Sequence, residues 1–108
     1  MKIGDIILIP FPFAELTHKK VRPAVVITET EDKYKDLLVS AISSVIPAMI
    51  SNREILLIPD NINNLRVDSV IKVDRIVALK REGKIADLGK LSTKELSEFK
   101  KKLIEMIK

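Results

Sequence analysis

The chain has 108 residues, 46% hydrophobic and 31% charged, which suits a single domain spanning residues 1–108 with its own core. It has no cysteine and one histidine, so disulfides and thiolate metal sites are excluded, and we expect no metal or cofactor. No apolar run is long enough to cross a bilayer and no signal-peptide pattern is present, so we expect a cytoplasmic protein. The formal charge of +4 permits a polyanionic partner.

Short apolar runs rich in β-branched residues predict strands through the first three quarters of the chain. The expected strands are residues 5–9, 24–28, 37–43, 54–58, 68–73 and 75–80. The last two are either one continuous strand or a strand kinked at Asp74. Residues 61–66 are rich in asparagine and predict a loop or a short helical turn. A polar connection punctuated by Gly83 and Gly89 is expected after the last strand.

The final segment predicts a helix that begins after Ser92. Glu95 lies three residues beyond Ser92, and this spacing is typical of a capping box. Apolar residues then recur every three or four positions, at Leu96, Phe99, Leu103, Met106 and Ile107. This stripe is expected to pack on the sheet, with Phe99 in the core. The pattern as a whole predicts a β-rich α+β fold: a small, strongly twisted antiparallel sheet or half-open β-barrel with a C-terminal helix.

Arg22 is the residue whose position most strongly suggests chemistry, because it stands between two β-forming runs and directly before Pro23. Proline restricts the preceding residue to extended conformations, which limits where the guanidinium can point. A guanidinium held in this way can grip a phosphate through two hydrogen bonds and stays charged at any relevant pH. The alternative is a structural ion pair with Asp5 or Glu15.

Three serines, Ser40, Ser43 and Ser44, cluster at the end of the third expected strand. A hydroxyl in this place can hold a phosphate oxygen or a reacting hydroxyl. The alternative is that these are ordinary turn serines.

The loop before Arg22 is basic at its tip and is preceded by two aromatic residues. Thr17, His18, Lys19 and Lys20 form this tip, which can contact a nucleic acid backbone. Phe11 and Phe13 can stack on bases if they are exposed, or anchor the loop if they are buried.

Several motifs follow one another along almost the whole chain. They are Gly4-Asp5 with the strand after it, Pro10-Phe11-Pro12-Phe13, Arg22-Pro23-Ala24-Val25-Val26, Val39-Ser40-Ala41-Ile42-Ser43-Ser44, Asp68-Ser69-Val70-Ile71, Asp74-Arg75-Ile76 and Lys90-Leu91-Ser92. In sequence and order they resemble the MazF/PemK family of toxins from type II toxin–antitoxin systems, within the Kid and CcdB superfamily. The N-terminal motifs are the most specific, and the others add weight through their order.

The resemblance implies a homodimeric toxin that cleaves single-stranded RNA, including mRNA, at selected sequences without a metal and thereby arrests growth. The implied products carry 2′,3′-cyclic phosphate and 5′-hydroxyl ends, and the implied partner is an acidic antitoxin. The family's catalytic arginine and strand-end hydroxyl correspond to Arg22 and Ser43, where many relatives have threonine instead of serine. The RNA contacts expected beside them are Phe11, Thr17, His18, Lys19, Lys20 and Ser44.

Some questions stay open at the level of sequence. The general base is Asp5, Glu15, His18 or a phosphate oxygen of the substrate, and the active hydroxyl is that of Ser43 or Ser44. The loop at 15–20 lacks the glycine that many relatives carry, so the bases that it reads are not implied. A toxin of the same fold that binds DNA gyrase without catalysis and an inactive binding module are the alternative functions.

Overall fold

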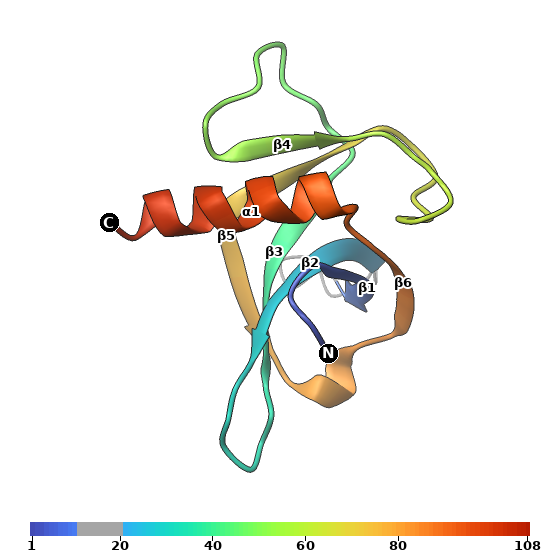
Figure 1. The fold of residues 1–108 in the computed structure, drawn as a ribbon. Coiled ribbons are helices and arrows are strands. Elements are labelled where there is room, and N and C mark those ends of the chain that lie inside the picture. Colours follow the sequence, from blue (N-terminus) through green and yellow to red (C-terminus); the bar gives the residue numbers. More distant parts are fainter. Residues whose placement is uncertain (11–20) are drawn as a thin grey trace.

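The computed structural model describes residues 1–10 and 21–108. The strands are β1 (Asp5–Pro10), β2 (Val21–Glu29), β3 (Leu37–Ser43), β4 (Glu54–Leu57), β5 (Ser69–Leu79) and β6 (Ala86–Lys90). A 3₁₀ turn, η1 (Arg81–Gly83), precedes β6, and the helix α1 (Thr93–Met106) follows it (Figure 1).

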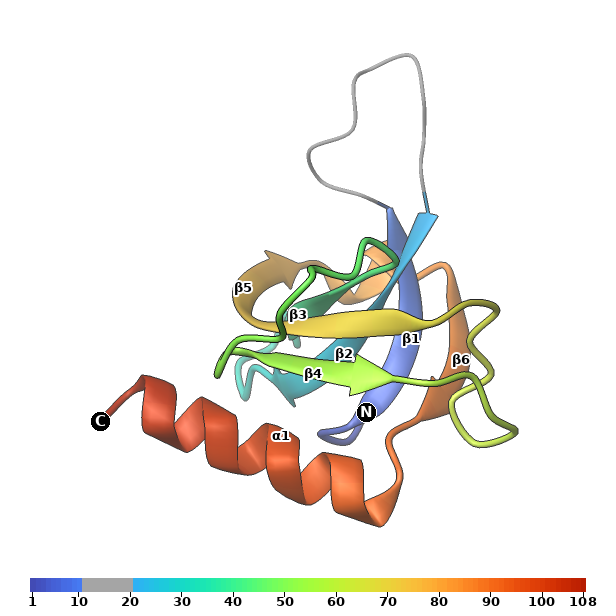
Figure 2. The ribbon, with the colours of Figure 1, turned by 90° about the horizontal axis from the view of Figure 1, so that it is seen from above.

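The strands form one antiparallel sheet in the order β4-β5-β3-β2-β1-β6. The sheet curls strongly, and α1 crosses one of its faces and runs alongside the edge strand β4 (Figures 1 and 2). The predicted fold, a twisted antiparallel sheet curled into a half-open barrel with a C-terminal helix, is therefore confirmed.

The long strand β5 carries the irregularity expected at Asp74. Its register with β3 jumps from Ser40–Ile76 to Ala41–Lys72, so residues 73–75 bulge out of the ladder. The Ser40 hydroxyl donates to the Val73 carbonyl at 2.9 Å and satisfies a backbone group that the bulge takes out of the ladder. Bulges bend a strand and increase its twist, which lets a single strand follow the curl of the sheet.

Residues 86–90 were expected to lie in a polar connection, and this prediction is wrong. They form β6, which pairs with β1 through Asp5–Lys90 and Leu8–Ala86. The segment Ala-Asp-Leu-Gly-Lys has little β-branched character and contains a glycine, so no periodic signal marks it. It becomes a strand because β1 offers a free edge.

Apolar side chains pack on both faces of the sheet. The cluster under the helix is centred on Phe99, which is fully buried as expected; its other buried members are Ile6, Val25, Ile42, Ile55, Leu57, Leu65, Ile71, Val73 and Leu91. The opposite face buries Ile7, Ile9, Ala24, Val26, Leu37 and Val39. No helix in the described part of the chain is long and apolar enough to cross a membrane.

The helix begins as its sequence predicts. The Ser92 hydroxyl accepts a hydrogen bond from the Glu95 backbone N–H at 3.2 Å, and the Glu95 carboxylate accepts one from the Ser92 N–H at 2.9 Å. Leu96 and Leu103 pack against the core cluster, as expected of the stripe. Ile107 does not, because it follows the last turn and is 78% exposed.

A carboxylate on β4 makes the stability of the fold pH-dependent. Glu54 is 9% exposed and accepts hydrogen bonds from the Lys72 ammonium and from the Ser51 N–H. These bonds, chiefly the one from Lys72, lower the pKa of Glu54 from 4.5 to about 2. The stability that they contribute is therefore present above pH 4.5 and lost as the pH falls toward 2.

We expect the Glu54→Gln variant to lose less stability than the wild type as the pH falls over that range. The measurement is the free energy of unfolding from urea denaturation at a series of pH values. Glu98→Gln, exposed on α1, is the control and should leave the profile of the wild type in place. The assignment fails if the two variants give the same profile.

Candidate functional site

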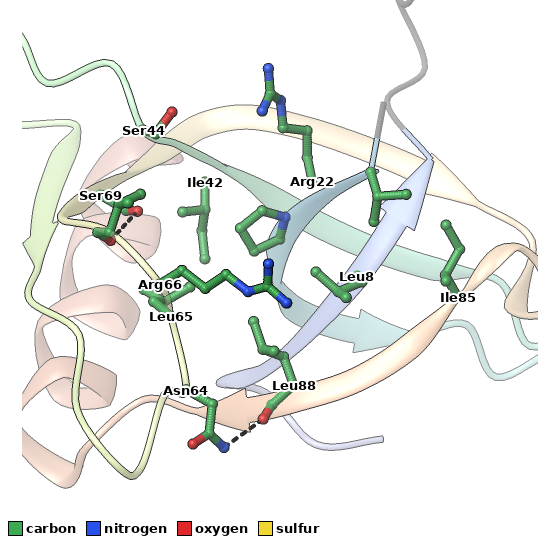
Figure 3. A pocket seen from close by; sticks show the side chains of 13 residues that line it. Leu8, Arg22, Ile42, Ser44, Asn64, Leu65, Arg66, Ser69, Ile85 and Leu88 are labelled. Atoms are coloured by element: carbon green, nitrogen blue, oxygen red, sulfur yellow. Dashed lines mark hydrogen bonds between the residues drawn. The ribbon is translucent and has the colours of Figure 1, made fainter. Parts of the chain in front are cut away.

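A cavity of about 510 Å³ opens at the end of the sheet where β1, β2 and β3 meet the loop before β5 (Figure 3). The described residues that line it are Leu8, Val21, Arg22, Pro23, Ile42, Ser44, Asn64, Leu65, Arg66, Val67, Ser69, Ile85 and Leu88. None of these is acidic or a histidine. The cavity therefore combines apolar walls with two arginines, which suits an anionic ligand that also has an apolar surface.

Arg22 lies within β2, which begins three residues before the predicted strand start, and is half-buried at the rim of this cavity. It pairs with Ile9 of β1, and the ladder to β3 pairs Ala24 with Ala41. The ladder ends at that pair, two residues short of Arg22 on β2 and of Ser43 on β3. The two residues that the motifs singled out therefore lie on neighbouring strands, at the same end of the sheet.

The two neighbouring serines have different surroundings. The Ser43 hydroxyl oxygen accepts a hydrogen bond from the Val45 N–H at 3.1 Å, which fixes the oxygen and leaves its proton to be donated. Ser44 is exposed and lines the cavity, on the same side of the view in Figure 3 as Arg22. Ser43 is therefore the last residue of β3, with its oxygen held by the backbone, whereas Ser44 follows the strand and lines the cavity together with Arg22.

Arg66 is the residue that sequence reasoning missed. It comes from the loop before β5, and its guanidinium reaches across the middle of the cavity (Figure 3). The sequence offers no motif for it, since a single arginine in an asparagine-rich loop is most often a solvated surface charge. Only the packing of that loop against β6 brings Arg66 to face the cavity.

The loop that carries Arg66 is held by the buried Asn63. The Asn63 amide oxygen accepts hydrogen bonds from the Asp60 and Leu65 N–H groups at 3.1 and 2.9 Å, and its amide nitrogen donates to the Ile58 carbonyl at 2.9 Å. Asn64, with a φ of 56°, donates its side-chain amide to the Leu88 carbonyl at 2.7 Å. Arg66 thus projects from a loop whose backbone is tied to itself and to β6.

Gly89 of β6 lies where the loop and the sheet approach closely. A Cβ at this position would lie 2.6 Å from the Asn63 carbonyl oxygen and still closer to the Ile62 carbonyl oxygen. The Lys90 N–H donates a hydrogen bond to the Ile62 carbonyl oxygen at 3.1 Å. Both obstacles are backbone atoms, so the loop must move to admit a side chain.

We expect Gly89→Ala to lower the free energy of unfolding by about 1–3 kcal/mol, as overpacking does. The measurement is thermal or urea denaturation. Gly83→Ala is the matched control, because a Cβ there would meet only the Leu79 side chain at 3.4 Å. Equal stability of the two variants would show that the loop is not packed on β6 in this way.

The remaining predicted site residues divide into two groups. Phe11, Thr17, His18, Lys19 and Lys20 lie outside the described residues, as do Phe13 and Glu15.

Asp5 is described, and the structure does not bring it to Arg22. It accepts a hydrogen bond from the Lys2 N–H at 2.9 Å and pairs with Lys90. It is four residues along β1 from Ile9, the partner of Arg22, which is about 14 Å at about 3.4 Å per residue. This placement removes Asp5 both as an ion-pair partner of Arg22 and as a general base beside it.

Comparison with known proteins gives a family and a fold. A family model described as PemK-like, MazF-like toxin of type II toxin–antitoxin system matches residues 2–107. Among solved structures, the Mycobacterium tuberculosis toxin MazF-mt6 superposes with a TM-score of 0.73 at 15% identity, covering 95% of each chain. A structure described as an endoribonuclease in complex with its cognate antitoxin from Mycobacterial species also gives 0.73, at 8% identity, covering 97% of this chain and 92% of that one. No curated protein sequence matches the chain.

Proposed function

Because the chain belongs to the family of PemK-like, MazF-like toxins of type II toxin–antitoxin systems, we propose that it is an endoribonuclease that cleaves single-stranded RNA without a metal ion. The observation that supports the proposal is that Arg22 lies at the rim of a cavity, at the same end of the sheet as Ser43 on the neighbouring strand β3. One of the two similar structures is described as an endoribonuclease, which supports the same class of activity.

RNA supplies its own nucleophile, so this site needs no activated side chain to attack the phosphate. The substrate's 2′-oxygen attacks phosphorus, the bond from phosphorus to the 5′-oxygen breaks, and the products end in a 2′,3′-cyclic phosphate and a 5′-hydroxyl. The protein must then stabilise the charge on the phosphoryl oxygens, orient the 2′-hydroxyl and supply a proton to the leaving oxygen.

Arg22 suits the first and last of these tasks. Its guanidinium can donate two hydrogen bonds to the phosphoryl oxygens, whose negative charge grows in the transition state. One of its N–H groups can also be the hydrogen-bond donor to the leaving 5′-oxygen. The Ser43 O–H, whose oxygen is held by the Val45 N–H, positions a phosphate oxygen beside it.

The described residues that line the cavity include no carboxylate or imidazole that could take the proton of the 2′-hydroxyl. We propose as its acceptor a phosphate oxygen of the substrate, a water molecule, or Glu15 or His18, which stand in the segment 11–20 of the sequence.

The direct test is to incubate the protein with a long single-stranded RNA in excess EDTA and to analyse the new ends. We expect cleavage that gives 2′,3′-cyclic phosphate and 5′-hydroxyl termini, with the Arg22→Ala protein as the baseline for contaminating nuclease. Activity equal to that baseline on RNAs of varied sequence would overturn the proposal and favour a toxin that acts by binding.

We further propose an acidic antitoxin as partner and a homodimer as the assembled state. The +4 charge of the chain favours an acidic partner, and the similar structure mentioned above was solved with its cognate antitoxin. Val45, Met49 and Ile50 are exposed apolar side chains in the β3–β4 connection, available to an interface. Light scattering gives the mass of the assembly, and co-purification with the antitoxin tests the partner.

A further inference from the structure

The guanidinium of Arg66 faces the cavity without being used to hold the fold together. Its side chain crosses the cavity in Figure 3, and no hydrogen bond or ion pair joins it to any other residue in the described part of the chain. The loop beneath it is fixed by Asn63, so the side chain starts from an ordered backbone. Such an arginine is available to a ligand. Because the loop backbone is already ordered, binding through Arg66 costs little backbone entropy.

The walls around Arg66 are apolar. Leu8 and Ile42 come from the sheet, Leu65 from the loop and Leu88 from β6. A nucleobase needs such surfaces for its faces and a few directed polar groups for its edge. The cavity, at about 510 Å³, is large enough for a purine and is continuous with the rim where Arg22 lies.

The donor pattern of a guanidinium distinguishes between the two purines. Its parallel N–H groups match two adjacent acceptors, which guanine offers at O6 and N7, whereas adenine places an amine donor beside its N7. We propose that the cavity binds a guanine base next to the cleaved phosphate and that Arg66 reads its O6 and N7 atoms. This assignment rests on the proposed cleavage of RNA and makes Arg66 a specificity-determining residue.

The first test is to map cleavage sites in a randomised single-stranded RNA pool. The wild type is expected to prefer guanine at one position beside the cut. Arg66→Gln should weaken that preference by roughly 10- to 100-fold, the worth of a good bidentate contact, and leave the other positions unchanged. Arg75→Gln is the control, because Arg75 is exposed on β5 and outside the cavity.

Two results would overturn this assignment. One is an unchanged base preference in Arg66→Gln. The other is an equal loss of cleavage for every sequence, which would make Arg66 a contact to the phosphate backbone.

The second test does not depend on cleavage. Guanosine 5′-monophosphate is titrated into the folded Arg22→Ala protein and followed by NMR, with adenosine 5′-monophosphate as the matched ligand. We expect the guanosine nucleotide to bind more tightly and to change the NMR chemical shifts of Arg66 and Leu88. In the double variant Arg22→Ala, Arg66→Gln, the two nucleotides should bind with equal affinity.

Equal affinity for the two nucleotides would refute the guanine site. Selective guanosine binding by a protein whose wild type cleaves no RNA would instead refute the proposed function and leave the site standing.

Discussion

Arg22→Ala is expected to lower the single-turnover rate of RNA cleavage by about 100- to 1,000-fold, the effect of removing one preorganised donor from a developing oxyanion. The chemical step should suffer more than RNA binding, since the charge that Arg22 stabilises grows only in the transition state. The measurement is the rate of cleavage at saturating enzyme, with RNA affinity measured separately on a 2′-deoxy analogue.

Variants of the neighbouring residues sharpen this test. Arg22→Lys keeps the charge but loses the two-pronged hydrogen bond, so it should recover only part of the rate. Ser43→Ala should slow cleavage more than Ser44→Ala, because Ser43 corresponds to the family's strand-end hydroxyl and its oxygen is held by the Val45 N–H. The reverse order for the two serines would move the active hydroxyl to Ser44. Near-normal activity of Arg22→Ala would contradict the mechanism altogether.

Phe99→Ala is expected to reduce the free energy of unfolding by about 3–5 kcal/mol, as other losses of a buried phenylalanine do. The ring is fully buried under α1 and belongs to the cluster that includes Ile6, Val25 and Ile71. Domains of this kind are stable by about 5–15 kcal/mol, so the variant should be close to unfolding at growth temperature.

Urea denaturation measures this loss directly. Ile104→Ala is the control on the same helix, since Ile104 is 54% exposed and its truncation should cost within about 0.5 kcal/mol. Phe99→Leu keeps an apolar side chain and gives a measurable intermediate if the alanine variant does not fold. A loss below 1 kcal/mol for Phe99→Ala would mean that α1 is not docked as described.

The strands that the chain's local patterns marked clearly are the ones that the structure contains. The run from Leu37 to Ser43 and the capped helix after Ser92 were predictable because each carries its own periodicity and its own end signals. β6 was not predictable, since Ala86–Lys90 has no such pattern and pairs only because β1 presents an open edge. The bulge that bends β5 at residues 73–75 is likewise set by its partner β3.

The residues of the candidate site also fall into those that the sequence indicated and those that only the structure brought to the site. The sequence by itself indicated the family. Proline restricts the backbone of Arg22 and drew attention to it, whereas Ser43 was singled out by the resemblance to the family. Only the tertiary structure decided that these residues lie at the same end of neighbouring strands and that Asp5 lies at the far end of β1. It alone brought Arg66 into the cavity, because that depends on a loop docking against a strand some 20 residues later in the chain, through contacts such as Asn64 to Leu88. Short-range patterns record backbone preference, whereas a site made of distant segments is created by packing.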